Sequence, residues 1–215
     1  MMRNGFLLLA SLAFVTAAFA QEEKWDVSGD YSYLRFNPTL QGFNSRSFNG
    51  GGGSGQFNVN KWLGIKGDFQ GYASTTWKVT YNGPIVTPHG TVPAGTYSTN
   101  GNMFTWMFGP VIRIPANKFT LWGETLFGGS QTNAYATLSK EFIANGADIK
   151  LIGSQHPFTM TAGGGLDLNM SKTVALRLGE FDYVLTRYTN PLTSTNNQNS
   201  FRYAAGVVFM FGGEK

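Results

Sequence analysis

The strongest constraint on this chain is an alternation of apolar and polar residues that recurs along most of its length. Successive side chains of a β-strand point to opposite faces, so a period of two predicts strands with one apolar and one polar face. The first such segment sets Trp25, Val27, Tyr31 and Tyr33 against Asp26, Ser28, Asp30 and Ser32. Seven more segments follow, with apolar positions at Phe57 and Val59; Leu63, Ile65 and Phe69; Phe104, Trp106, Phe108 and Ile112; Phe119, Leu121 and Phe127; Phe158, Met160, Leu166 and Leu168; Val174, Leu176, Phe181, Tyr183 and Leu185; and Phe201, Tyr203, Val207, Phe209 and Phe211. We therefore expect an all-β chain of eight strands.

One of these segments changes phase in its middle. Val174 and Leu176 share a face with Phe181 only if one extra residue is inserted near Leu178 and Gly179. An extra residue on one strand of a pair is a β-bulge, and we predict one there.

The connections between the predicted strands are alternately long and short. The long ones cover residues 38–54, 78–101, 130–156 and 188–199, and the short ones lie at 61–62, 115–117 and 170–173. Because all long connections then lie at one end, both termini lie at the other. This organisation is typical of a transmembrane β-barrel.

Charged residues in the predicted strands all fall on the polar face. They are five bases (Lys66, Arg113, Lys118, Arg177, Arg202) and seven acids (Asp26, Asp30, Asp68, Glu124, Asp167, Glu180, Asp182). The apolar face is aromatic near the strand ends, as the interfacial girdles of membrane barrels are. An eight-stranded barrel is just wide enough for inward side chains to fill it. We predict a closed eight-stranded antiparallel up-and-down transmembrane β-barrel; a soluble lipocalin-like barrel or sandwich is the alternative.

Residues 1–20 have the pattern of a secretory signal peptide. One basic residue, Arg3, precedes an apolar run that is too short to span a bilayer, and Ala18 and Ala20 form an A-x-A-like cleavage site before Gln21. We expect cleavage between Ala20 and Gln21 and a barrel domain at residues 21–215. The chain has no cysteine, which excludes disulfides and thiolate sites.

The final strand resembles the terminal targeting motif of bacterial outer-membrane barrels. Gly206, Phe209 and Phe211 in "FRYAAGVVFMF" have the spacing of that motif, although Ala204 stands where a polar residue is usual. With "NVNKWLGIKGDF", "LFGGSQ" and "GGGLDLNMSKTVALR", the chain resembles the small stand-alone barrels related to the transmembrane part of outer membrane protein A. The resemblance implies a bacterial outer-membrane location, contact with outer-membrane lipid and insertion by the barrel assembly machinery.

The inward charges are the candidate site. We expect Lys66, Arg113, Glu124, Arg177, Glu180, Asp182 and Arg202 to form a network in the lumen, with the arginines paired to Glu124, Glu180 and Asp182. Such a network either locks the lumen or lines a narrow wet path, and eight-stranded barrels favour the lock.

Other motifs indicate little chemistry. The run "NGGGGSG" at 49–55 lacks the Gly-Lys-Ser/Thr of a phosphate loop and is expected to be a flexible external loop. His89 and His156 lie in long connections, and we expect no metal site and no cofactor. Residues 78–101 are expected to form a projecting hairpin, and 141–152 the extended ends of two strands.

Composition leaves three functional hypotheses. Removal of Arg3 with the signal peptide leaves 15 basic and 12 acidic residues, a formal charge of +3 that does not suggest nucleic-acid binding. The favoured hypothesis is a structural or adhesion role through long external loops, whose ligand the sequence does not name. The alternatives are a narrow small-solute pore and a loop-based enzyme; we expect no enzyme.

Overall fold

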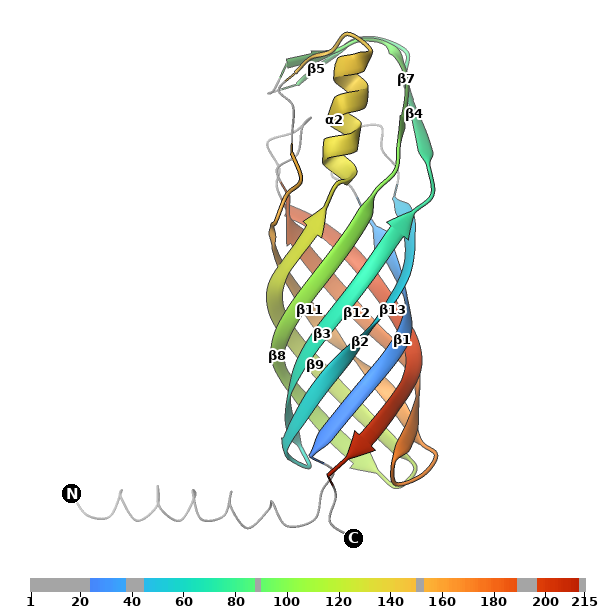
Figure 1. The fold of residues 1–215 in the computed structure, drawn as a ribbon, viewed down its shortest axis with the longest axis vertical. Coiled ribbons are helices and arrows are strands. Elements are labelled where there is room, and N and C mark those ends of the chain that lie inside the picture. The colour runs from blue at the N-terminus through green and yellow to red at the C-terminus, as the bar shows by residue number, and fades with distance from the viewer. Residues whose placement is uncertain (1–23, 38–44, 88–89, 150–152, 189–196, 213–215) are drawn as a thin grey trace, which may run out of the picture.

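We analysed a computed structural model of the chain, which describes residues 24–37, 45–87, 90–149, 153–188 and 197–212. The predicted signal peptide and its cleavage site between Ala20 and Gln21 lie outside the described residues. The described chain is a tall barrel with a small folded unit, which we call the cap, at one end (Figure 1).

Eight strands form the predicted closed barrel, in the order β1-β13-β12-β11-β9-β8-β3-β2. All neighbouring pairs are antiparallel, and β1 closes the sheet on β13 with Trp25 opposite Phe211. The strands are β1 (Trp25–Phe36), β2 (Arg46–Asn60), β3 (Leu63–Ser74), β8 (Asn102–Ala116), β9 (Phe119–Thr132), β11 (Phe158–Asn169), β12 (Val174–Arg187) and β13 (Asn197–Phe211). The short turns at 61–62 and 170–173 lie where the sequence predicts them, and the one predicted at 115–117 lies at 117–118, because Pro115 and Ala116 still belong to β8.

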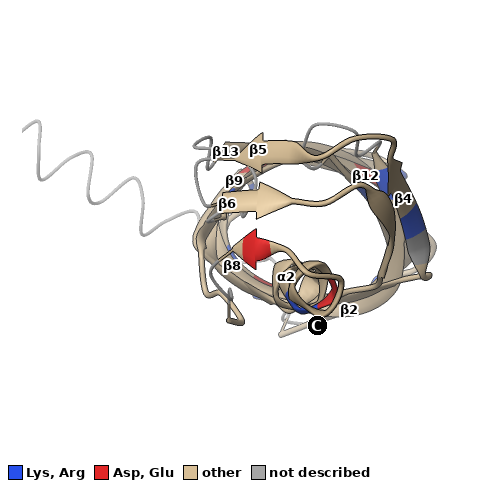
Figure 2. Ribbon diagram, turned by 90° about the horizontal axis from the view of Figure 1, so that it is seen from above, with Lys and Arg blue, Asp and Glu red and all other residues tan. Residues whose placement is uncertain are grey.

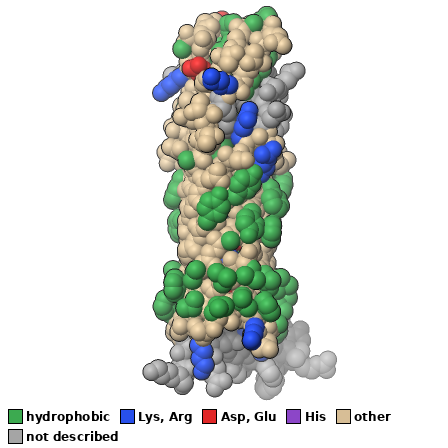
Figure 3. Space-filling model, turned by 90° about the vertical axis from the view of Figure 1, so that its right-hand side faces the viewer, with side chains coloured by type: hydrophobic (Ala, Val, Ile, Leu, Met, Phe, Trp, Pro, Cys, Tyr) green, Lys and Arg blue, Asp and Glu red, His purple; other side chains and the backbone are tan. Residues whose placement is uncertain are grey.

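The apolar positions of each strand face outward, and the polar ones face inward. Ile65, Leu121 and Phe181 are each more than half exposed, whereas Lys66, Thr120 and Asp182 are buried. On the face seen in Figure 3, hydrophobic side chains form a band across the lower part of the barrel, with basic residues above and below it. A closed sheet leaves no unpaired edge, and an apolar outer belt is suited to lipid, so this is a transmembrane barrel. Among the described residues, no helix is both long and apolar enough to cross a membrane.

The predicted bulge is confirmed in β12. Leu166 pairs with Gly179, and the next residue, Asp167, pairs with Arg177, so Leu178 is the extra residue. The pairing of β12 with β13 shifts between Arg177 and Glu180. The bulge keeps Arg177 and Glu180 both on the inner face of the barrel.

The glycine run at 49–55 is part of the barrel wall, so the prediction of a flexible loop is wrong. These residues belong to β2 and pair with both β1 and β3. A Cβ atom at Gly52 would lie 2.0 Å from the carbonyl oxygen of Phe69 and 2.7 Å from Oε1 of Gln70. Glycine is therefore required because backbone and inward side chains of β3 approach β2 too closely for any larger residue.

The cap is built from the two central connections. The described residues at 77–87 and 90–99 form the predicted projecting hairpin, with β4 (Trp77–Tyr81) paired to β7 (Gly95–Thr99) and β5 (Ile85–Thr87) paired to β6 (Gly90–Val92). The strand β10 (Asp148–Ile149) joins the edge of β6.

Helix α2 (Ala134–Ala144) contradicts the expectation that residues 141–152 are extended strand ends. Its buried face carries Tyr135, Leu138, Ser139 and Phe142, which are spaced at the helical intervals of three and four residues. That period was present in the sequence. Most of this three-and-four-residue spacing lies before residue 141, so the segment 141–152 taken alone does not reveal the helix.

A single apolar core joins the cap to the upper lumen. Its buried members are Leu34, Phe36, Phe48, Tyr72, Val79, Tyr81, Val92, Tyr97, Met103, Tyr135, Leu138, Phe142, Ala147, Val184 and Tyr188. Figure 2 shows α2 and strands β5 and β6 over the barrel mouth. Burial raises the pKa of Tyr81 to about 12 and also raises the pKa values of Tyr135 and Tyr188, so these phenols stay neutral at physiological pH.

The replacement Phe142→Ala tests whether this core holds the cap. Phe142 is fully buried and contacts the Tyr97 ring edge-on at 4.7 Å between centroids. Truncation should cost about 3–5 kcal/mol, the usual value for a buried aromatic. We expect faster proteolysis and hydrogen exchange in the cap segments within residues 77–99 and 134–149, with the barrel still folded. Replacement of its partly exposed neighbour, Ile143→Ala, should change neither the rate of proteolysis nor the rate of hydrogen exchange in the cap. Equal protection of the cap in both variants would contradict the assignment of this core.

Candidate functional site in the barrel lumen

Five charged residues at the centre of the lumen come from four strands of the wall. Lys66 lies on β3, Glu124 on β9, Glu180 and Asp182 on β12, and Arg202 on β13. The two-residue period turns each of them inward, and all five are buried. Residues distant in sequence therefore meet inside the barrel.

Arg202 is the centre of the network. Its guanidinium donates to Oδ1 of Asp68 at 2.8 Å, to Oδ2 of Asp182 at 2.7 Å and to Oε1 of Glu180. Oε1 of Glu124 is a further ion-pair contact at 3.5 Å. One arginine on β13 thus contacts acids of the neighbouring strand β12 and of β9 and β3, which are not neighbours of β13 in the barrel.

Lys66 and Arg177 complete the positive side of the network. Lys66 donates to Glu124 at 2.9 Å and contacts Glu180 at 3.4 Å. Arg177 donates to Glu180 at 2.9 Å and to Asp167 at 3.0 Å. The Lys66 ammonium and the Arg177 guanidinium also lie 4.7 and 4.5 Å from the ring centre of Trp122, where the π face attracts cations.

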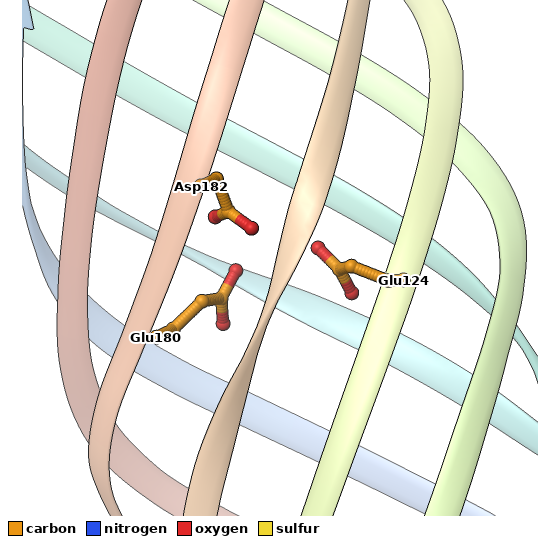
Figure 4. Close-up of side chains that lie close together, drawn as sticks. All are labelled: Glu124, Glu180 and Asp182. Atoms are coloured by element: carbon orange, nitrogen blue, oxygen red, sulfur yellow. The ribbon is translucent and has the colours of Figure 1, made fainter.

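Three carboxylates converge in this region. Oxygen atoms of Glu124, Glu180 and Asp182 lie within 4.8 Å of one another, and Figure 4 shows the three side chains pointing toward one another. Like charges at this separation repel strongly away from water. Because Lys66, Arg177 and Arg202 each contact at least one of these carboxylates, three of the protein's own cations balance the three acids of the cluster.

Arg113 lies apart from the other predicted site residues. It is partly exposed, near the lower end of β8, and contacts Oδ2 of Asp26 at 3.5 Å. The predicted pairing with Glu124, Glu180 or Asp182 is wrong for this arginine. The reason is its position along the barrel axis, because Arg113 is three residues from the end of β8 and lies below the level of the network.

Asp68 and Asp167 are the network members that the predicted site omits. Both stand at inward positions of the two-residue alternation. That alternation identifies them as lumen residues, but it does not show which bases they contact. The alternation predicts that Lys118 faces inward, but this residue is exposed in the turn after β8, so that prediction is wrong. In the described residues the lumen therefore holds four bases (Lys66, Arg113, Arg177, Arg202) and seven acids (Asp26, Asp30, Asp68, Glu124, Asp167, Glu180, Asp182).

Inward glycines make room for the network. A Cβ atom at Gly163 would lie 2.1 Å from Oδ1 of Asp182, and one at Gly165 would lie 2.5 Å from the Trp122 ring. These contacts are closer than atoms can approach. The glycines of β11 therefore set the space into which the charged and aromatic side chains fit.

The residues of the predicted terminal motif lie on both faces of β13. Gly206 faces inward against Asp30 of β1, where a Cβ atom would lie 2.7 Å from the Asp30 Cα. Phe209 and Phe211 face outward and are about half exposed. Their recognition during assembly stays a prediction.

Of the two histidines, His156 is exposed just before β11, and His89 lies outside the described residues.

The replacement Arg202→Met tests whether the network holds the barrel together. It keeps an unbranched side chain but leaves Asp68, Glu180 and Asp182 with less positive charge in a buried site. We expect a loss of about 3–5 kcal/mol in the free energy of unfolding, measured by urea titration in detergent micelles. Arg35→Met, on the exposed outer face of β1, should change it by less than about 0.5 kcal/mol. Equal stability of the two variants would contradict a structural network.

No protein-family model and no curated protein sequence matches the chain. Solved structures do match. The crystal structure of Neisserial surface protein A superposes with a TM-score of 0.59 at 14% identity, covering 87% of this chain and 97% of that chain. The outer membrane protein OprG from Pseudomonas aeruginosa gives a TM-score of 0.51 at 13% identity, covering 90% of this chain and 98% of that chain. The chain thus has the fold of small bacterial outer-membrane barrels.

Proposed function

We propose that this chain is an integral protein of a bacterial outer membrane whose closed barrel holds the cap at the cell surface as a rigid binding domain. The observation that carries the proposal is the apolar core shared by the cap and the upper lumen.

The shared core supports a closed barrel. The ring of Phe36 lies 4.9 Å from Phe48 and 6.4 Å from both Tyr135 and Tyr188, and the last two rings are 5.4 Å apart. Tyr135 belongs to α2, and the other three belong to the upper wall. Below them lies the ion-pair network. Two filled layers, one aromatic and one ionic, favour a lumen without a water path.

The same core favours binding by a preformed surface. Loops that are already ordered lose little conformational entropy when a partner binds, so a folded cap presents a more effective surface than flexible loops. Loops at one end of a rigid scaffold commonly carry the binding function of a barrel.

Charge suggests the kind of partner. The described residues of the cap and upper rim include five bases (Arg35, Arg46, Lys78, Lys140, Arg187) and two acids (Glu141, Asp148). Seven acids are sequestered in the lumen, which leaves the external end positive. A positive surface attracts anionic partners and speeds their association. We therefore propose an anionic ligand or surface as the partner.

Export and assembly belong to the same proposal. Residues 1–20 would be removed between Ala20 and Gln21, and the barrel assembly machinery would recognise Gly206, Phe209 and Phe211 of the last strand. The proposed role is not enzymatic: the clustered carboxylates of the lumen are buried in ion pairs rather than open to a substrate.

Single-channel recording tests the closed barrel. Residues 21–215, refolded in detergent and inserted into a planar bilayer, should show no steady openings because both layers fill the lumen. A correctly folded sample must first show the barrel by circular dichroism. Reproducible openings whose conductance rises on Arg113→Ala would contradict the closed lumen and support a narrow pore.

Binding to dextran sulfate tests the anionic partner, with uncharged dextran as the control polymer. We expect the double variant Lys78→Gln/Lys140→Gln to elute from immobilised dextran sulfate at lower salt, because it removes two charges from the cap. Lys118→Gln/Lys172→Gln removes two exposed charges at the opposite end and is the matched control. An equal shift for both pairs would show that net charge, not the cap, determines binding.

A further inference from the structure

An open groove of about 640 Å³ crosses the outside of the barrel wall just below the cap. It lies over β2, β3, β8 and β9. Its exposed lining residues are Asn49, Ala73, Asn102, Phe104, Gln131, Asn133 and Ser154, which lie on the outer face or in the adjoining connections. The groove is separate from the lumen network and from the cap surface discussed above.

Small residues form the floor of the groove. Ala73 lies between Asn49 of β2 and Asn102 of β8, and Gly71 lies opposite Phe104. A Cβ atom at Gly71 would meet the Gly51 carbonyl oxygen at 3.8 Å and the Phe104 ring at 4.0 Å, which are ordinary contacts. The wall therefore tolerates a larger side chain at position 71. With glycine there, the space stays open.

The chemistry of the lining favours a neutral, hydroxyl-rich ligand. Four amide side chains and one serine hydroxyl surround the floor, and no charged residue lines the groove. Amides both donate and accept hydrogen bonds, as sugar hydroxyls require. Phosphate and carboxylate groups are instead recognised by arginine and lysine. Phe104, about half exposed, adds an aromatic ring against which the C–H face of a sugar can pack.

The position of the groove indicates that its ligand also has an apolar part. Below it on the same outer face lie the half-exposed rings of Phe69 and Phe108, which contact each other edge-on at 5.5 Å. These rings belong to the lipid-facing belt, whereas the amides border the cap. A molecule lying along this face would have an apolar part below and a polar part above.

We propose that this groove binds the saccharide headgroup of a glycolipid in the membrane leaflet on the cap side, with the acyl chains over Phe69 and Phe108. The inference rests on the transmembrane barrel and is independent of the anionic partner proposed for the cap. It assigns a lipid site to the wall rather than to the loops.

Native mass spectrometry of the refolded chain tests the proposal with diglucosyl diacylglycerol as the probe and phosphatidylglycerol as the comparison lipid. We expect the glycolipid to be retained about tenfold more tightly, the equivalent of one or two net hydrogen bonds. Gly71→Leu, which fills the groove, should abolish that preference. Gly55→Leu is the matched control, because Gly55 faces outward on β2 with no atom within 4 Å of an added Cβ.

Equal retention of the two lipids, or an unchanged preference in Gly71→Leu, would overturn the proposal. Free maltose that displaces the glycolipid at equal concentration would identify a soluble-sugar site and would also overturn it. Folding of each variant is checked by its heat-dependent gel mobility. If Gly71→Leu does not fold, Gln131→Leu provides the same test from the exposed rim of the groove.

Discussion

The interaction on which the rest of this structure depends is the pairing of buried bases with buried acids inside a narrow closed wall. Arg202 alone contacts acids from three strands, and Lys66 and Arg177 share Glu180 with it. Ions removed from water are costly unless each one has partners of good geometry. The bulge at Leu178 and the glycines at 163 and 165 can be understood in this light, because they place and accommodate those partners.

Above the charges, the lumen changes character and becomes aromatic. These aromatic residues hold the cap on the barrel. Tyr135 of α2 packs on Phe36 and Tyr188, and its hydroxyl donates a hydrogen bond to Oε1 of Gln198 on β13 at 2.6 Å. The external unit is thereby part of the same folded body as the barrel wall. Rigidity, a closed lumen and a positive outer end all favour presentation of a surface over passage of a solute.

The alternation of residues, together with the alternately long and short connections, was sufficient to predict the barrel and its up-and-down strand order. The alternation also gave the inward position of Lys66, Glu124 and Arg202, because a period of two fixes which face of a closed sheet each side chain occupies. It could not give height along the axis, so Arg113 was grouped with charges that it does not reach. Composition misled at residues 49–55, where glycine serves close packing and not flexibility. Helix α2 was missed because its period of three and four residues lies inside a segment treated as a connection between strands.

A double-mutant cycle between Arg202 and Asp68 tests the central claim most directly. Both side chains are 1% exposed and their charged atoms are 2.8 Å apart, so Arg202→Met, Asp68→Leu and the double variant should give a coupling energy above about 2 kcal/mol. The pair Arg113 and Asp26, at 3.5 Å and with exposures of 14% and 11%, should give a smaller value. A coupling below about 0.5 kcal/mol for Arg202 and Asp68 is the size found for an exposed surface pair. That result would mean that water fills the lumen and that the charges do not lock it.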